Sequence, residues 1–239
     1  MRIRSLGYRT DLIFARHHGV VADRGDYLAI RTPSNPGFHW GNFLLFRDPP
    51  AEGALERWKQ RFREEIASHQ PARHLAFGWD SPEGERGVLE PFLDDGFLLN
   101  ENVVLTAEAV RPPPRPNRDV AVRPLASDDD WRQAMENQVA CHAAEFSLPE
   151  YRAFKARQME GYRRMAEAGR GAWFGAFADA RLVADLGVFA DEGVARFQAV
   201  ETHPDFRRRG ICGTLVYESA RHALAAPGTE RLVMVADVH

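Results

Sequence analysis

The hydrophobic positions in the second half of the chain switch between a helical period and a strand period. Spacings of three and four connect Tyr151, Phe154, Gln158, Tyr162 and Met165, which predicts a helix. Apolar runs bounded by short polar turns predict strands instead. The predicted order is strand, helix, helix, strand, strand, strand, helix, strand, at about residues 120–125, 128–139, 151–165, 172–178, 181–190, 194–202, 215–225 and 231–236.

The first half shows a weaker form of the same alternation. Strands are predicted at residues 11–16, 27–32, 39–46, 74–79 and 98–107, and helices at residues 54–67 and 87–94. The first of these helices carries Leu55, Trp58, Phe62 and Ile66 on one stripe. The aromatic residues of this half follow the same periods, so we expect them in its core rather than on a stacking platform.

A run of prolines separates the two halves. Pro112, Pro113, Pro114 and Pro116 exclude a sheet interior and a helix, and they favour an extended spacer. The sequence therefore predicts two tandem α+β domains, each with a mixed sheet. Their predicted limits are residues 1–110 and 119–239, with a proline-rich linker at residues 111–118.

Composition narrows the classes of function. The 239 residues are 44% hydrophobic, enough for two cores, and their formal net charge is −3 with basic residues spread along the chain. We therefore expect no nucleic-acid partner. We also expect no membrane partner, since no apolar stretch approaches the roughly 20 residues of a span. The two cysteines and the polar N-terminus fit a reducing cytoplasm, and no grouping of ligands predicts a metal site.

The most informative segment joins the strand at 194–202 to the helix at 215–225. It contains three consecutive arginines, Arg207 to Arg209, followed by Gly210 and Gly213. Glycine lets the main chain approach a ligand, the first turn of a helix offers free N–H groups, and arginine adds bidentate donors. Such a turn between a strand and a helix predicts a phosphate site.

This segment resembles the acetyl-CoA pyrophosphate loop of the GCN5-related N-acetyltransferase (GNAT) superfamily, whose pattern is Arg/Gln-x-x-Gly-x-Gly/Ala. Arg207, Gly210 and Cys212 occupy the fixed positions, although Cys212 departs from the usual small residue. The resemblance extends to the order of elements over residues 120–239. It implies an acetyl-CoA N-acyltransferase-like fold, with acetyl-CoA as the acyl donor. By position it assigns cofactor contacts to Val200, Thr202, Arg207, Arg208, Arg209, Gly210, Ile211, Cys212, Gly213 and Thr214.

Glu201 is the candidate catalytic base. It interrupts an otherwise apolar segment, where poor solvation raises a carboxylate pKa and favours taking a proton from an ammonium. Pairing with Arg196 on a solvated sheet face is the alternative. His203 is a second candidate base, and a structural role at the entrance of the loop explains it as well.

Further roles follow from the resemblance. In the family, the segment between the first two helices overhangs the acceptor pocket, which makes His142 and Glu145 candidate substrate contacts. An exposed helix end explains both residues as well. Cys212 lies in the phosphate loop, so we expect packing or phosphate approach rather than nucleophilic attack. Cys141 has no sequence neighbour that would lower its pKa and stays unassigned.

The first half resembles a degenerate acetyltransferase domain. Phe92 to Phe97 matches the family's Tyr-x-x-x-Gly-Phe spacing, with Phe92 in place of the tyrosine. In the loop at residues 47–53, two prolines remove N–H donors, and Asp48 and Glu52 repel phosphate. We therefore expect a similar scaffold with a disabled cofactor site.

The chain stops after its last predicted strand, where the family continues with a helix and a hairpin that carry its tyrosine acid. We favour a shortened chain. The alternatives are that the first half, or a second copy in a homodimer, covers the exposed sheet edge.

These observations predict an enzyme that moves an acetyl group from acetyl-CoA to a primary amine of a small molecule or peptide by direct transfer. A non-catalytic acyl-CoA sensor or structural partner is the alternative, because the acid for the thiolate is absent from both halves. Nucleic-acid binding through Arg207 to Arg209 is a third hypothesis, which the net charge opposes.

Overall fold

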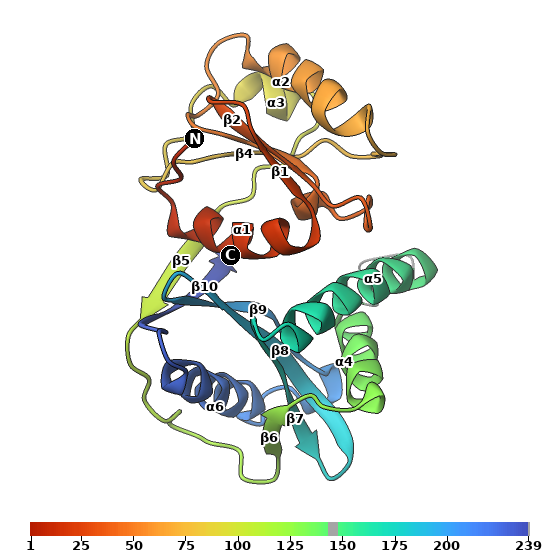
Figure 1. Ribbon diagram of the computed structural model, residues 1–239, viewed down its shortest axis with the longest axis vertical. Coiled ribbons are helices and arrows are strands. Elements are labelled where there is room, and N and C mark those ends of the chain that lie inside the picture. Colours follow the sequence, from red (N-terminus) through yellow and green to blue (C-terminus); the bar gives the residue numbers. More distant parts are fainter. Residues whose placement is uncertain (143–147, 239) are drawn as a thin grey trace. The chain divides into compact units, whose positions relative to one another are not determined.

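The computed structural model describes residues 1–142 and 148–238, and it divides into two compact units (Figure 1). Unit 1 comprises Met1–Val104 and Ala236–His239, and unit 2 comprises Leu105–Val235. The proline-rich segment (residues 111–118) belongs to unit 2 by this division. Whether residues 1–110 and 119–239 also fold as independent domains stays a prediction. No helix within the described residues is long and apolar enough to cross a membrane.

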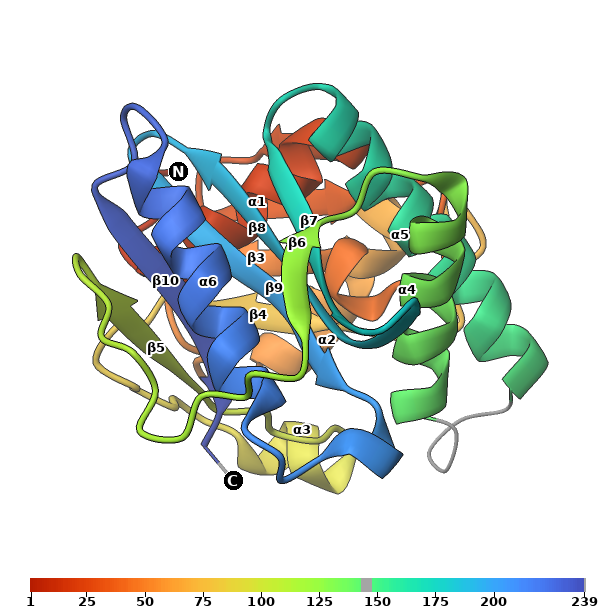
Figure 2. The same cartoon turned by 90° about the horizontal axis from the view of Figure 1, so that it is seen from below.

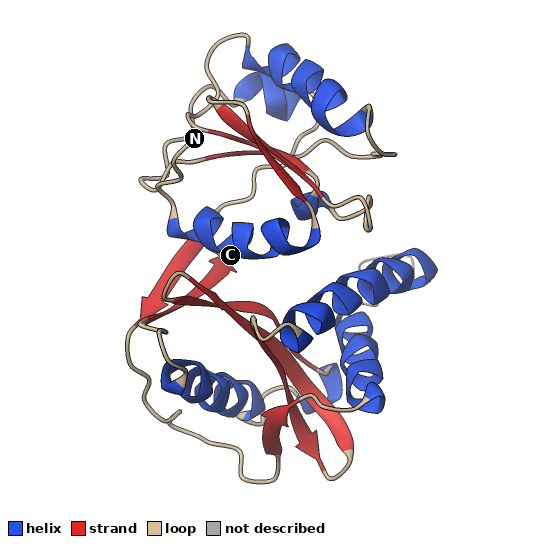
Figure 3. Cartoon of the chain, in the orientation of Figure 1, coloured by secondary structure: helices blue, strands red, loops and turns tan. Residues whose placement is uncertain are grey.

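Unit 1 is a four-stranded sheet with helices on both faces (Figure 3). The strand order is β1-β2-β3-β4, in which β3 and β4 are parallel and the other neighbours are antiparallel. Its helices and strands are, in chain order, α1 (Leu6–His18), β1 (Val20–Asp23), β2 (Tyr27–Arg31), β3 (Phe43–Phe46), α2 (Ala54–Phe62), β4 (Phe77–Trp79) and α3 (Glu90–Asp94).

Alternation along β2 builds the core on both faces of this sheet. Leu28 and Ile30 pack in one cluster with Leu12 of α1, whereas Ala29 packs in another with Trp58 of α2. The predicted stripe of α2 is therefore its buried face, and a π-helical turn at Arg63–Ala67 continues it.

The strand predicted at residues 11–16 is wrong, because helix α1 occupies these residues. The backbone N–H groups of Arg4 (2.6 Å) and Ser5 (2.8 Å), just before the helix, donate hydrogen bonds to the buried carboxylate of Asp80. Because this acceptor lies 75 residues away from Ser5, no local signal in the sequence announces it.

Unit 2 contains a six-stranded sheet of order β5-β10-β9-β8-β7-β6. Helix α6 covers one face, and helices α4 and α5 cover the other (Figure 2). The order of elements predicted from residue 120 onward is confirmed. The strands of this sheet and the helices that cover it are, in chain order, β5 (Asn102–Ala107), β6 (Ala121–Pro124), α4 (Asp128–Cys141), α5 (Leu148–Glu167), β7 (Gly171–Ala178), β8 (Arg181–Asp191), β9 (Val194–Thr202), α6 (Ile211–Ala225) and β10 (Arg231–Asp237).

Strand β5 forms the edge of this sheet beside β10. The side chains of Arg231 in β10 and Glu108, just after β5, form an ion pair at 2.7 Å. The uncovered edge expected for a shortened chain is therefore not found. A strand predicted for the first half of the chain covers it instead.

The two units share one motif. In each, a helix joins two neighbouring parallel strands, as β3–α2–β4 in unit 1 and β9–α6–β10 in unit 2. Each helix begins after a glycine with positive φ, 67° at Gly53 and 76° at Gly210. This shared motif agrees with the predicted likeness of the two halves.

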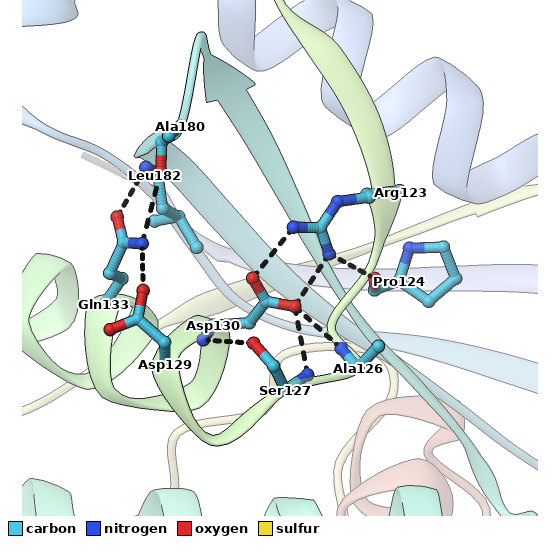
Figure 4. A network of polar contacts seen from close by, with 9 residues as sticks. All are labelled: Arg123, Pro124, Ala126, Ser127, Asp129, Asp130, Gln133, Ala180 and Leu182. Carbon is cyan, nitrogen blue, oxygen red and sulfur yellow. Dashed lines mark hydrogen bonds and ion pairs between the residues drawn. The ribbon is translucent and has the colours of Figure 1, made fainter.

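Asp130 holds the start of α4 (Figure 4). Its carboxylate accepts two hydrogen bonds from the Arg123 guanidinium, at 2.7 and 2.8 Å, and one each from the N–H groups of Ala126 and Ser127. Ser127 Oγ in turn accepts from Asp130 N. The Arg123 guanidinium holds the pKa of the buried Asp130 carboxyl well below its usual range. One side chain thus ties the end of β6 to the first turn of α4.

Replacing Asp130 with alanine leaves Arg123 and two N–H groups without their acceptor. We expect the free energy of unfolding to fall by about 2–3 kcal/mol. In a chain of this size, the thermal midpoint then falls by roughly 5–10 °C. Because the folded-state pKa of Asp130 is lowered, its contribution is complete above about pH 4 and is lost as the pH falls through the folded-state pKa. Thermal melts of both proteins at pH 7 and pH 3 measure this difference.

Asp129→Ala is the matched control. Among the described residues, the exposed Asp129 side chain contacts Arg132 and Gln133 alone at short range, so the midpoint should hardly change. An Asp130→Ala melt that matches this control, or a midpoint difference that does not narrow at pH 3, would contradict the role given to Asp130.

Candidate functional site

The phosphate loop (residues 207–214) joins β9 to α6. Arg208 and Gly210 have positive φ, 63° and 76°, so that the chain turns sharply before the helix begins. In the part of the chain that the structure describes, no backbone N–H group from Arg208 to Gly213 donates a hydrogen bond. Free N–H groups at the positive end of a helix dipole favour an anion. The geometry therefore fits the phosphate site predicted from the sequence.

The three arginines of the loop have different surroundings. Arg207 Nε donates to the carbonyl oxygen of Thr202 (3.1 Å), and Arg209 Nη2 donates to that of Asp205 (2.9 Å). The Arg208 side chain is exposed and has no polar partner among the described residues. Two arginines thus brace the loop, and Arg208 is available to an anion.

A β-bulge in β9 sets the direction of Glu201. The pairs Asp185–Glu201 and Gly187–Gln198 leave one residue of β8 opposite two residues of β9, and Ala199 in the bulge has a φ of 47°. An extra residue reverses the alternation of side chains beyond it. Gln198 and Glu201 are therefore on the same face of the sheet, although they lie three positions apart.

Side-chain contacts agree with this phase shift. Gln198 Nε2 donates to the hydroxyl of Tyr162 in α5 (2.9 Å), and Glu201 Oε1 lies 2.9 Å from Nε2 of His142 at the end of α4. Val200, between them, packs into the core beneath α6. The side chains of Glu201 and His142 are 20% and 28% exposed. The structure thus brings the predicted base and one predicted substrate contact together as a carboxylate–imidazole pair.

Gln138 of α4 holds the bulge in place. Its Nε2 donates to the carbonyl oxygen of Ala199 (2.9 Å) and to Asp185 Oδ1 (2.7 Å). Asp185 is fully buried and also accepts hydrogen bonds from Asn137 Nδ2 (2.7 Å) and Trp173 Nε1 (2.9 Å). Burial raises the pKa of Asp185 to about 7.

A buried amine completes this polar cluster. Lys155 Nζ donates to the side-chain oxygens of Gln138 (3.2 Å) and Gln158 (2.9 Å), and burial lowers the pKa of Lys155 to about 8. Gln138 thus links a buried carboxyl, whose pKa burial raises, to a buried amine, whose pKa burial lowers.

Neither cysteine is prepared for nucleophilic attack. Cys141 Sγ donates to the carbonyl oxygen of Thr202 (3.4 Å), and burial, reinforced by the Glu201 carboxylate, raises the pKa of Cys141 to about 12. Burial also raises the pKa of Cys212. Both thiols are protonated at neutral pH, which agrees with direct transfer and not with a covalent cysteine intermediate.

Strands β9 and β10 part at the site. Their parallel pairing covers Val194–Arg196 and Arg231–Val233, and it ends there. Beyond this point no described strand pairs with the β10-facing edge of β9. The carbonyl oxygen of Ala199 accepts from the Gln138 side chain, and that of Thr202 accepts from Arg207 and Cys141. This is the stretch whose main chain at Val200 and Thr202 was predicted to contact the donor.

Two predicted site residues remain, the substrate contact Glu145 and the second candidate base His203. Glu145 lies outside the described residues. His203 caps a short 3₁₀ turn, where its Nδ1 accepts from Asp205 N (3.3 Å), and its Nε2 lies 3.3 Å from Arg181 Nη2. These contacts fit the structural role at the entrance of the loop.

Sequence reasoning missed Gln138 and Asp185. A signal existed for Asp185, because it is a carboxylate inside the apolar strand predicted at residues 181–190, as Glu201 is in the next strand. Gln138 gave no signal, because a glutamine on a helix is ordinary until its partners in the fold are known.

Comparisons with known proteins agree with this geometry. The family model described as Acetyltransferase (GNAT) family matches residues 131–239. A functionally unknown conserved protein from Staphylococcus epidermidis ATCC 12228 has a similar structure, with a TM-score of 0.74 and 14% identity over 93% of this chain and 85% of that chain.

A GCN5-related N-acetyltransferase from Kribbella flavida is also similar, with a TM-score of 0.66 and 14% identity over 98% of this chain and 86% of that chain. No curated protein matches the sequence. At these identities the two structures establish the fold, which extends over both units. The second half of this chain is thus similar to the GNAT family of acetyltransferases over residues 131–239, and the order of elements and the geometry of the loop at residues 207–214 agree with that likeness.

Proposed function

We propose that the chain transfers an acetyl group from acetyl-CoA to a primary amine of a small molecule or peptide. The observation that supports this most directly is the phosphate loop, where the N–H groups from Arg208 to Gly213 are free at the start of α6. In this proposal they bind the pyrophosphate, with Arg208 as an additional donor. The open edge of β9 binds the pantetheine arm and polarises the acetyl carbonyl through its main chain.

The Glu201–His142 pair supplies the base. The pair lies on the α4/α5 face at the end of β9, where the strand has parted from β10. We assign Glu201 the proton of the acceptor ammonium and His142 a contact with the acceptor, so that the neutral amine attacks the thioester carbon. The N–C bond forms and the C–S bond breaks, so that CoA leaves as the thiolate. The acylated nitrogen then loses its extra proton to solvent, and the thiolate takes up a proton from solvent.

Binding of acetyl-CoA should depend on Gly210. Ligand at about 100 times its dissociation constant adds roughly 2.7 kcal/mol, which raises the thermal midpoint by about 5–10 °C. In Gly210→Glu we expect no rise, because a carboxylate side chain then lies beside the anion site and the positive φ is lost or strained. Thermal melts with and without acetyl-CoA measure the effect.

The same substitution at Gly53 is the matched control. Gly53 starts α2 of unit 1 with a similar φ of 67°. Gly53→Glu should lower the midpoint of the free protein but keep the rise with acetyl-CoA. If wild type shows no rise, or if Gly210→Glu keeps it, the phosphate loop is not the donor site.

Turnover should depend on Glu201. We expect Glu201→Gln to lower kcat about 100-fold or more while acetyl-CoA affinity stays within about threefold, because proton removal is lost but the loop is unchanged. Release of free CoA thiol with a panel of primary amines measures the rate.

Glu218→Gln, at an exposed carboxylate of α6 paired with Arg221, should keep wild-type turnover. Full activity of Glu201→Gln would remove Glu201 from the mechanism. Binding of acetyl-CoA without thiol release for any amine would favour the non-catalytic sensor.

A further inference from the structure

The proline-rich segment (residues 111–118) packs directly against the phosphate loop. A Cβ atom on Gly210 would collide with the carbonyl oxygen of Arg115, and one on Gly213 would lie 3.3 Å from Cβ of Pro113. Both motif glycines therefore face this segment at close range. Their small size is needed for this contact as well as for a ligand.

Asn117 makes the polar part of the contact. Its Nδ2 donates to the carbonyl oxygen of Arg209 (2.9 Å), and its backbone N donates to Thr214 Oγ1 (2.8 Å). Its Oδ1 accepts from Asp119 N (2.9 Å), which fixes the amide orientation. Thr214 Oγ1 also donates to the carbonyl oxygen of Gly210 (3.1 Å). Two consecutive carbonyl groups of the loop are thus held by Asn117 and Thr214.

This arrangement determines where the free N–H groups of the loop point. In a planar trans peptide, the C=O and N–H bonds are antiparallel. Holding the carbonyl oxygens of Arg209 and Gly210 therefore fixes the directions of the N–H bonds of Gly210 and Ile211. Neither N–H group donates to another described group, and both belong to the anion site.

We propose that Asn117 is a positioning residue for the donor, acting through the phosphate loop and assisted by Thr214. It keeps the N–H groups of Gly210 and Ile211 aligned before the pyrophosphate arrives. Prolines on both sides of Arg115 stiffen the segment, so that little conformational freedom is lost when the donor binds. This inference rests on the proposed acetyl-CoA site, and it adds a segment to that site that the family motif does not include.

The test is the affinity for coenzyme A, measured by calorimetry on the full chain. In Asn117→Ala we expect the dissociation constant to rise about tenfold, while kcat at saturating acetyl-CoA stays within about twofold. Thr214→Val, which removes the hydroxyl but keeps the shape, should give a similar rise. The double variant should bind more weakly than either single variant, because Asn117 holds the carbonyl of Arg209 and Thr214 holds that of Gly210.

Asp119→Ala is the matched control, since its exposed side chain has no partner among the described residues and its backbone N–H remains. Its affinity should stay within about twofold of wild type. Unchanged affinity in Asn117→Ala would overturn the role of Asn117. If Asn117→Ala does not fold, Asn117→Asp takes its place, because it keeps an acceptor for Asp119 N but loses the donor to Arg209, and unchanged affinity in that variant decides against the role. Failure of the wild type to bind coenzyme A would instead refute the proposed function.

Discussion

The position of the Glu201 side chain in unit 2 depends on one extra residue in β9. With regular alternation, Glu201 would share the face of Phe197, which packs beneath α6. The bulge at Ala199 turns Glu201 to the opposite face, where its carboxylate contacts the imidazole of His142. A positive φ at alanine is costly by itself and persists only where the surroundings determine it. Gln138 holds the backbone of Ala199 in this conformation, because its Nε2 donates hydrogen bonds to the carbonyl oxygen of Ala199 and to the buried carboxylate of Asp185.

The same constraint explains why polar groups are buried so deeply behind the site. Asp185 lies opposite Glu201 in the pairing of β8 with β9, and the side chains of Asp185 and Lys155 both form hydrogen bonds with the side chain of Gln138. A buried polar network is stable only when its members satisfy one another. Here the network fixes the orientation of one amide, and that amide fixes the path of the strand. Stability and site geometry are therefore set by the same hydrogen bonds.

Sequence reasoning succeeded where the determinants are local. The order of elements after residue 120 follows from hydrophobic periods, and the turn before α6 lies where the arginines and glycines predicted it. It failed where the stabilising contact is distant in sequence. Helix α1 is the example, because the N–H group of Ser5 at its start donates to Asp80. It also could not show that β5 would lie beside β10, since strand pairing is a property of the whole sheet. The pairing of Glu201 with His142 depends on the bulge, for which no local pattern exists.

Asp80, which accepts hydrogen bonds at the start of α1, also affects the order in which the protein folds. Asp80 follows β4 and lies 75 residues beyond Ser5, so the N-terminal helix emerges from the ribosome long before its carboxylate acceptor. Until β4 has paired with β3, the N–H groups at residues 4 and 5 have only water as an acceptor. Contacts of such long sequence separation form late, because the loop between them must close first. Helix α1 is thus completed only after the sheet that it covers.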